Sequence, residues 1–165
     1  MPSSTGIRVK PWNRVDAQVY TLATSDGKGR GNLNICTYVT PVAMKPKRFV
    51  LGIYKGTKTL DNLEHNPVGI LQYMAEDQWE HVKLLGKKTG FSTDKVTALG
   101  SDVEHVAGGL YRLKGVLALV HLRFLDRIDA GDHWAWVANV DSYENLREAP
   151  SLTFSELKRR RLILT

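Results

Sequence analysis

Hydrophobic and polar positions alternate in several short runs along the chain, and this pattern predicts a protein built mainly of strands. The runs are rich in β-branched and aromatic residues and are separated by turn-forming residues. In the last run, Trp134, Trp136, Ala138 and Val140 fall on one face. We expect six strands, at residues 18–24, 32–40, 48–54, 68–74, 115–127 and 134–143.

The stretches between these runs predict turns and a few helices. The glycine-bearing turn at residues 25–29 predicts a hairpin between the first two strands, and residues 41–46 are expected to form a connection. Leu60 and Leu63 lie at helical spacing before Asn66-Pro67, where a helix must end. We expect helices at residues 57–65, 75–88 and 92–99 and a helical tail at residues 144–165.

This arrangement predicts a mainly β protein, a six-stranded antiparallel Greek-key barrel with a few flanking helices. The 165 residues favour a single domain with its core at about residues 15–143. We see no signal peptide or bilayer-spanning run. The single cysteine, Cys36, excludes an intramolecular disulfide and is typical of a reducing compartment. We therefore expect a cytoplasmic protein without contact to a membrane.

The positive charge of the chain indicates a negatively charged ligand. The formal net charge is +6, which suits a phosphorylated small molecule, nucleic acid or anionic lipid. The densest cluster, at residues 158–161, is most simply the solvated face of a helix. A basic nucleic-acid-binding barrel is therefore the weakest of the functional hypotheses, and nucleic acid is not expected as a partner.

Residues 55–59 are a candidate phosphate site. Lys55, Thr57, Lys58 and Thr59 open a predicted helix after an apolar strand, and a phosphate is bound well by hydroxyls, ammonium groups and the free N–H groups of a helix start. The alternative is a surface helix with Thr57 or Thr59 as its N-cap. The glycine-rich loops of common nucleotide-binding motifs are missing from the sequence.

Two further residues carry candidate chemistry. His133 follows Gly131-Asp132 at the start of a predicted strand, where it serves as a proton carrier, a ligand contact or a structural residue. Cys36 is either a wall of a ligand site, a packed core residue or a nucleophile, and nothing near it in sequence indicates activation. The other histidines do not lie at metal-ligand spacing, so we expect no metal site.

Several motifs, in their order along the chain, resemble the flavin reductase family with the FMN-binding split β-barrel fold. Residues 32–37 (Asn-Leu-Asn-Ile-Cys-Thr) are similar to the family segment N-G-M-T-x-S, and residues 57–62 to S-R-T-x-x-N. Residues 68–73 resemble the strand F-x-V-N-x-L weakly, and G-D-H is present intact at residues 131–133. The resemblance extends over about residues 15–143.

The resemblance implies an FMN site and its residues. The phosphate would bind at residues 57–59, the ring and ribityl chain along residues 34–38, and a nicotinamide near His133. The cofactor contacts implied in this way, together with the local motif, are Asn34, Ile35, Cys36, Thr37, Tyr38, Lys55, Thr57, Lys58, Thr59 and Asn62.

Two functions follow from the resemblance. The first is an NAD(P)H-dependent flavin reductase, a homodimer that supplies reduced flavin to a monooxygenase component. The second is a protein that holds FMN, or transfers electrons through it, without turnover. The first is the preferred hypothesis, although Trp134 and Trp136 are bulkier than the usual family residues and could cover the flavin face against a nicotinamide.

Overall fold

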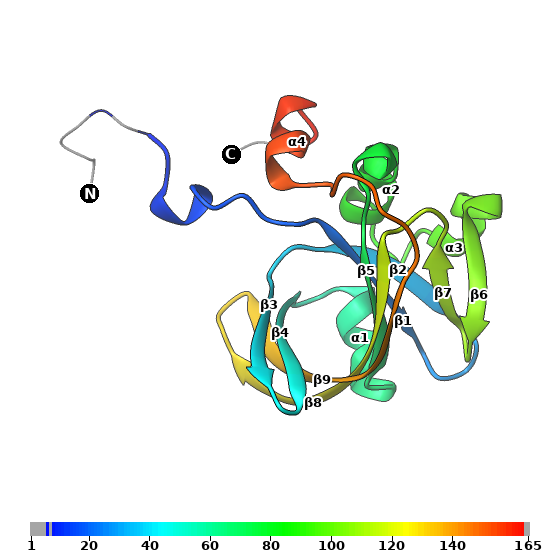
Figure 1. Ribbon diagram of the computed structural model, residues 1–165. Helices are drawn as coiled ribbons and strands as arrows, with labels where there is room; N and C mark the ends of the chain where they lie inside the picture. Colours follow the sequence, from blue (N-terminus) through cyan, green and yellow to red (C-terminus); the bar gives the residue numbers. More distant parts are fainter. Residues whose placement is uncertain (1–5, 7, 164–165) are drawn as a thin grey trace.

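The computed structural model describes residue 6 and residues 8–163, and it is dominated by one antiparallel sheet (Figure 1). Seven strands pair in the order β2-β1-β5-β8-β9-β4-β3. Their bounds are β1 Tyr20–Ser25, β2 Gly31–Cys36, β3 Val39–Met44, β4 Lys47–Tyr54, β5 Val68–Tyr73, β8 Ala118–Asp129 and β9 His133–Asn145. The mainly β prediction is therefore confirmed.

The strand order makes the sheet curl back on itself. β2 and β3 are its two opposite edges, yet only Thr37 and Tyr38 separate them in the chain. Two residues span only about 7 Å, so the two edges must come together at this corner. Gly52 N–H on β4 donates to Tyr38 O at 2.7 Å, which extends the β3–β4 pairing to the corner itself. No strand ladder between the edges closes the sheet within the described residues.

The prediction of one strand at residues 32–40, followed by a connection at 41–46, is wrong. The chain turns at Thr37-Tyr38, and residues 39–44 form the separate edge strand β3. Pro41 is unfavourable in a strand because proline has no N–H to donate, and the sequence therefore predicted a connection here. An edge strand tolerates this loss, and the register of β3 against β4 shifts between Pro41 and Ala43. The main sheet therefore has seven strands, not six.

A two-stranded sheet, β6 (Val103–Ala107) with β7 (Leu110–Leu113), was also missed. Its turn contains Gly108 and Gly109, both with positive φ, and a Gly-Gly pair between strand-like runs is a hairpin signal in the sequence. Buried Gln72 on β5 joins this hairpin to the main sheet. Its Nε2 donates to Tyr111 O at 2.9 Å, and its Oε1 accepts from Leu113 N–H at 2.7 Å.

Apolar residues fill both sides of the curled sheet. Every residue of β1 is buried, because its alternating side chains enter two different cores. Leu22, Leu51 and Trp136 belong to the core inside the curl. Leu33, Ile70 and Leu85 belong to a second core under the helices. Trp136 and Ala138 are both buried, in agreement with the predicted apolar face of β9.

Short helices pack around the sheet. They are η1 Pro11–Asn13, α1 Lys58–His65, η2 Glu76–His81, α2 Val82–Lys87, α3 Lys95–Leu99, η3 Gly100–Asp102 and α4 Phe154–Arg159. Helices α2, α3 and α4 bury residues in the second core, whereas α1 buries Leu63 in the core inside the curl. The helix predicted at residues 75–88 is a 3₁₀ segment followed by α2, with Val82 and Leu85 buried as expected. Ala75 N–H donates to Gln78 Oε1 at 2.9 Å and starts the first of these turns.

The C-terminal tail is less helical than predicted. β9 continues to Asn145, and only residues 154–159 are α-helical. Leu157 and Leu162 are buried in the second core, the one under the helices. In the basic run, Arg159 and Arg160 pair with Glu156, and Arg160 lies 4.4 Å from the ring centre of Trp79. The basic run therefore lies on the surface, and two of its arginines pair with a glutamate of the same helix.

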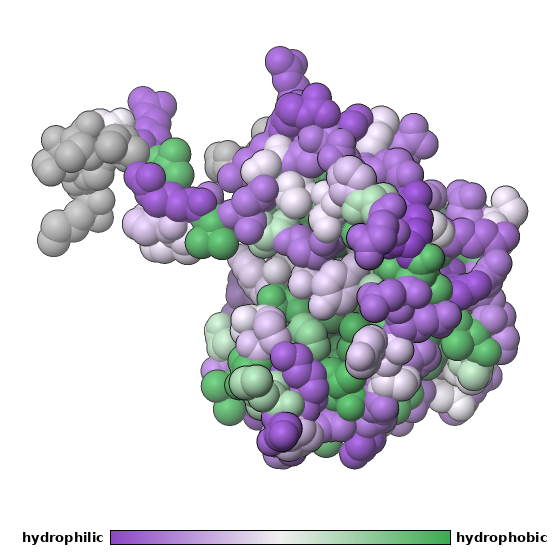
Figure 2. Space-filling view, viewed as in Figure 1, coloured by the Kyte–Doolittle hydropathy of each residue, from purple (hydrophilic) through white to green (hydrophobic). Residues whose placement is uncertain are grey.

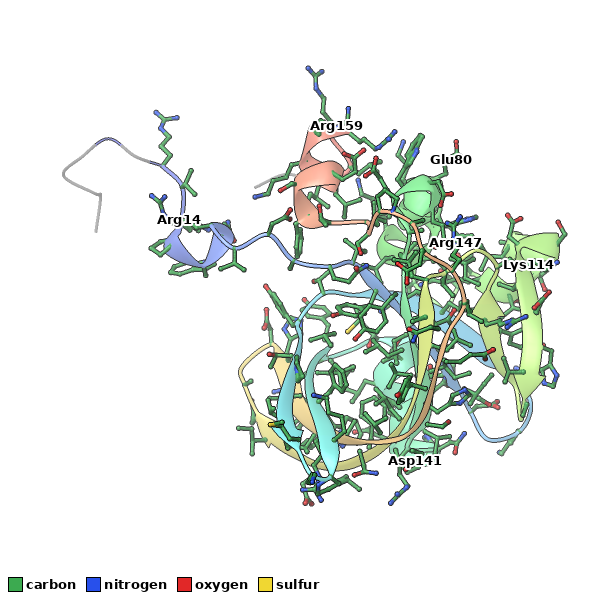
Figure 3. The ribbon with its side chains drawn as sticks, in the orientation of Figure 1. Arg14, Glu80, Lys114, Asp141, Arg147 and Arg159 are labelled. Atoms are coloured by element: carbon green, nitrogen blue, oxygen red, sulfur yellow. The ribbon has the colours of Figure 1, made fainter. Side chains whose placement is uncertain are left out.

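Charged side chains lie mostly on the outside, as Figure 3 shows for Glu80, Lys114, Asp141, Arg147 and Arg159. Figure 2 shows hydrophilic residues over the side with α2 and α4 and apolar residues over the curled strands. Across the described part of the chain, no helix has both the length and the apolar character needed to cross a bilayer.

Candidate functional site

Two adjoining hollows lie along the edge strand β2 and form one cleft. The larger, of about 510 Å³, lies between β2, residues 86–90 (the end of α2 and the loop after it) and α4, and we name it the loop hollow. The smaller, of about 240 Å³, reaches Tyr38 and His133, and we name it the histidine hollow. The two hollows share the residues Asn34, Ile35, Thr37, Tyr54, Thr57 and Thr59.

The start of α1 lies where the two hollows meet. Thr57 is the N-cap, since its Oγ1 accepts from Leu60 N–H at 3.3 Å and donates to Tyr54 O at 2.8 Å. The N–H groups of Lys58 and Thr59 come before the first intrahelical bonds, so helix geometry leaves them for another acceptor. Capping and anion binding are therefore compatible, because the cap uses the Thr57 hydroxyl and leaves these two N–H groups.

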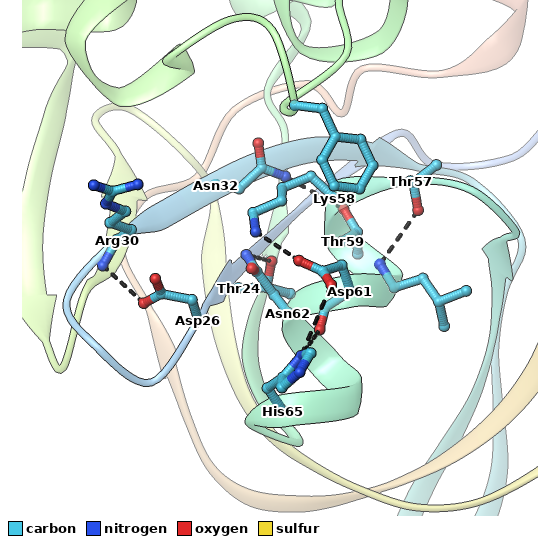
Figure 4. A network of polar contacts seen from close by, with 12 residues as sticks. Thr24, Asp26, Arg30, Asn32, Thr57, Lys58, Thr59, Asp61, Asn62 and His65 are labelled. Carbon is cyan, nitrogen blue, oxygen red and sulfur yellow. Dashed lines mark hydrogen bonds and ion pairs between the residues drawn. The ribbon is translucent and has the colours of Figure 1, made fainter.

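The side chains around this helix start form the network in Figure 4. Asn32 Nδ2 donates to Thr59 Oγ1 at 3.4 Å, so the hydroxyl proton of Thr59 remains for a second partner. Lys58 Nζ pairs with Asp61 at 2.6 Å and lies 5.6 Å from the ring centre of Phe91. The charge of Lys58 is therefore shared with Asp61 rather than fully free.

Gly90 lets the loop after α2 approach this network closely. A Cβ at Gly90 would lie 2.3 Å from Asn32 Oδ1 and 2.9 Å from Lys58 Cβ, both far inside contact distance. Only glycine fits here without moving the phosphate-binding candidates. The motif Lys87-Lys88-Thr89-Gly90 then contributes to the wall of the loop hollow.

A buried lysine forms part of the same wall. Lys95 is 2% exposed, and its Nζ donates to Leu85 O at 2.8 Å and to Asn34 Oδ1 at 3.3 Å. Burial lowers the pKa of Lys95 to about 8. Both partners are neutral oxygens, so a negatively charged or electron-rich ligand group in the cleft would compensate a buried charge.

The turn at Gly131-Asp132-His133 lies beside the start of α1. His133 pairs with Tyr54 in the β4–β9 register, and Lys55 N–H donates to Asp132 O at 2.9 Å. His133 Nδ1 is 2.6 Å from Asp132 Oδ1. A carboxylate only accepts, so Nδ1 carries the proton and Nε2 is left for another group. The ring centres of Tyr38 and Tyr54 lie 5.1 Å and 5.0 Å from the imidazole.

The structure brings most of the sequence-predicted site residues together. Along one or both hollows lie Asn34, Ile35, Cys36, Thr37, Tyr38, Thr57, Lys58, Thr59 and His133.

Lys55 and Asn62 line neither hollow. Lys55 Nζ pairs with Asp129 at 2.9 Å, and Asn62 is fully buried and donates to Thr24 Oγ1 at 3.1 Å.

Trp134 and Trp136 do not cover the cleft, contrary to the sequence-based expectation. Arg127 lies 4.2 Å from the ring centre of Trp134 and 4.8 Å from that of Trp136, and Lys55 lies 4.7 Å from that of Trp134. Neither indole lines either hollow. The bulk of these residues therefore leaves the mouth of the cleft open.

Cys36 is a buried wall residue of the histidine hollow. Burial raises the pKa of its thiol to about 12, so the thiolate is scarce near neutral pH. We expect the folded protein at pH 8 to react with iodoacetamide at least about 10-fold more slowly than the urea-unfolded chain. Mass spectrometry of the alkylated product measures this, and equal rates would contradict the assignment as a wall residue.

Comparison with known proteins places this geometry in a family. The flavin reductase like domain matches residues 12–162. The chain belongs to the flavin reductase-like family. No curated protein sequence gave a significant match. Three segments of this domain are far apart in the sequence and adjacent in space. They are residues 34–38, the start of α1 and the turn before His133.

Solved structures show the same fold at low sequence identity. An FMN-binding protein from Thermus thermophilus is 18% identical, with a TM-score of 0.78 over 93% of this chain and 90% of that one. Nitrilotriacetate monooxygenase component B from Mycobacterium thermoresistibile is 18% identical, with a TM-score of 0.75 over 86% and 76%. The flavin reductase component of a bacterial two-component tryptophan halogenase is 16% identical, with a TM-score of 0.75 over 87% and 88%.

Sequence reasoning missed the far wall of the cleft. Three parts of this wall were not predicted as site residues: Lys95, residues 86–90 at the end of α2, and the apolar residues of the C-terminal segment. The pair Lys87-Lys88 was visible as a basic cluster next to Thr89-Gly90, which is the one local signal for this wall. Nothing local marks Lys95, because its role depends on its burial against β2.

Proposed function

We propose that this protein binds FMN in the cleft and transfers hydride to it from NADH or NADPH. The observation that carries this proposal is the convergence of three separate segments, residues 34–38, the start of α1 and the His133 turn, on one cleft. Family membership and the FMN-binding protein of Thermus thermophilus support the choice of flavin.

The residues present fit such a cofactor. The N–H groups of Lys58 and Thr59, the Thr59 hydroxyl and the Lys58 ammonium form a donor set for a phosphate. Gly90 keeps this set accessible, since a Cβ there would displace Asn32 and Lys58. β2 is an edge strand, so backbone groups on its free side are available to the polar edge of a ring.

Each part of the cleft then has a defined task. The start of α1 holds the phosphate, and residues 34–38 orient the ring system in the histidine hollow. Bound flavin supplies the chemistry of accepting two electrons as hydride. Tyr38 and Tyr54 provide aromatic faces at the mouth, each about half exposed or more. His133, held through Nδ1 by Asp132, presents Nε2 toward the entering nicotinamide and fixes its position.

Partners follow from the same comparison. Two of the solved structures are component B of a monooxygenase and the flavin reductase component of a two-component halogenase. We propose that this chain likewise supplies reduced flavin to a separate oxygenase. We also propose a homodimer, supported by a groove of about 640 Å³ of mixed apolar and charged lining in which Tyr143 is 72% exposed.

Turnover is tested by adding NADH or NADPH to the flavin-loaded protein under anaerobic conditions. We expect a yellow protein whose visible absorbance bleaches with one of the two nucleotides, while the His133→Ala variant stays yellow longer at equal nucleotide concentration. A yellow protein that neither nucleotide bleaches would identify a flavin-holding or electron-transfer protein instead. A protein that takes up no flavin would contradict both functions.

A further inference from the structure

We propose that Lys95 is a positioning residue for the flavin ring. It holds the side-chain oxygen of Asn34, and the amide N–H₂ group of Asn34 is thereby left to donate to the electron-rich edge of the ring. This inference rests on the proposed function and adds to it a residue that lies outside every motif by which the flavin was placed.

The start of α3 fixes the position of the Lys95 side chain. Asp94 is the N-cap of this helix, and its two carboxylate oxygens accept from the N–H and the hydroxyl of Thr97 at 2.9 Å and 2.8 Å. Lys95 follows as the first residue of the helix and is 2% exposed. Its Nζ reaches Leu85 O on α2 at 2.8 Å and Asn34 Oδ1 on β2 at 3.3 Å. Three elements of the fold therefore hold this ammonium in place.

The chemistry of an ammonium group determines which way the Asn34 amide points. An ammonium has three donors and no acceptor, so the amide atom that meets Nζ of Lys95 is the oxygen. The backbone of Asn34 is held separately, because its carbonyl accepts from the Thr21 hydroxyl at 3.1 Å. With the oxygen and the backbone both fixed, the amide nitrogen has a single orientation.

The amide nitrogen of Asn34 is available to a ligand. Asn34 is half-buried and lines both hollows of the cleft, and no side-chain hydrogen bond of the described residues uses its Nδ2. Asn32, two positions earlier on β2, differs because its Nδ2 donates to Thr59 Oγ1 at 3.4 Å. Of these two amides on β2, the one that Lys95 holds is therefore the one whose donor is free.

Lys95 also brings a positive charge to the wall without a negative partner. No ion pair of the described residues includes it, and the neighbouring Asp94 is occupied by its cap. Burial lowers the pKa of Lys95 to about 8, so the group is still largely protonated at pH 7. A flavin gains electron density when it is reduced, so a cation and an N–H donor beside the ring favour the reduced form.

Asn34→Asp tests the amide while keeping an acceptor for Lys95. A carboxylate has nearly the same shape and accepts from Nζ, but it has no N–H to donate. We expect the dissociation constants of FMN and riboflavin to rise together by at least about 10-fold, because the ring is common to both. Titration of the apoprotein by flavin fluorescence measures both constants, and unchanged values would overturn the proposal.

Lys95→Met tests the positioning through a double-mutant cycle with Asn34→Ala. We expect Lys95→Met to weaken binding of oxidised riboflavin about 10-fold in the wild type and less than about 2-fold in the Asn34→Ala background, since its effect passes through the amide. Reduced riboflavin is expected to lose a further 10-fold, which corresponds to a midpoint potential about 30 mV lower for a two-electron couple. Anaerobic reductive titration measures the potential.

Leu99→Ala is the matched control, because Leu99 lies on the same helix and is 5% exposed in the second core. It is expected to lower stability in urea while changing neither the riboflavin constant by more than about 2-fold nor the potential. Equal losses from Lys95→Met in both backgrounds, an unchanged potential, or the same loss in Leu99→Ala would overturn the proposal. If Lys95→Met does not fold, Asn34→Asp decides. A wild-type protein that binds neither flavin would instead overturn the proposed function.

Discussion

Replacing Lys58 with Ala and Thr59 with Val is expected to weaken FMN binding by about 30-fold and riboflavin binding by less than about 3-fold. The two ligands differ only in the phosphate, and the double variant removes one ammonium and one hydroxyl from the donor set at the start of α1. Hydrogen bonds to a charged group contribute roughly 1.5–3 kcal/mol, and a 30-fold change corresponds to about 2 kcal/mol. Fluorescence quenching of each flavin by the apoprotein measures both constants.

Asp61 offers a matched control of opposite sign. Its carboxylate holds Lys58 Nζ at 2.6 Å, and it would compete with a phosphate for that ammonium. Asp61→Asn is therefore expected to tighten FMN binding by a few-fold and to leave riboflavin unchanged. Equal losses for FMN and riboflavin in the double variant would show a distorted cleft, not a phosphate site.

The second large effect is a change in the pH dependence of stability when Lys95 becomes Met. The pKa of Lys95 is lowered by burial from 10.5 to about 8. Between these two pH values the unfolded chain binds more protons at this residue than the folded one, so this residue makes the apoprotein more stable as pH rises. The stability it contributes is complete above pH 10.5 and is lost as pH falls through about 8, a difference of about 3 kcal/mol.

Urea unfolding of the apoprotein from pH 7 to pH 10.5 measures this effect as a difference between variants. Cys36 and Tyr20 have raised pKa values in the folded protein, so each of them makes the folded state less stable as the pH rises. Both remain in Lys95→Met, so their contributions cancel in the comparison. We expect the stability of the wild type relative to Lys95→Met to rise through this window. Parallel stability curves would contradict the buried charge.

The site residues that sequence reasoning found belong to short continuous motifs. Thr57–Thr59 sit on a helix start that local capping chemistry predicts, and His133 follows a turn with a positive-φ glycine, Gly131. Lys55 is part of the first motif and pairs with Asp129, because the β8–β9 turn brings that carboxylate to 2.9 Å from its Nζ. A contact between residues 74 apart is not visible in either local segment.

The limits of the fold prediction have equally specific causes. Pro41 is a poor strand residue in general, and only its place on the edge strand β3 makes it acceptable. The 32–40 run reads as one strand because its composition is continuous, while the turn at Thr37-Tyr38 is imposed by the meeting of the two sheet edges. The hairpin β6–β7 had a local signal in Gly108-Gly109, but its two strands are short and do not alternate clearly between apolar and polar residues.

By itself, the sequence determined the mainly β character, the helix predicted at residues 57–65 with its capped start, the strand at residues 32–36 and the turn before His133. Each depends on neighbours along the chain, through side-chain alternation, capping and turn chemistry. The tertiary structure alone decided that Lys95 is buried against Asn34, that Gly90 packs on Asn32, and that Trp134 stacks with Arg127 away from the cleft. Those features depend on which distant surfaces the curled sheet brings into contact.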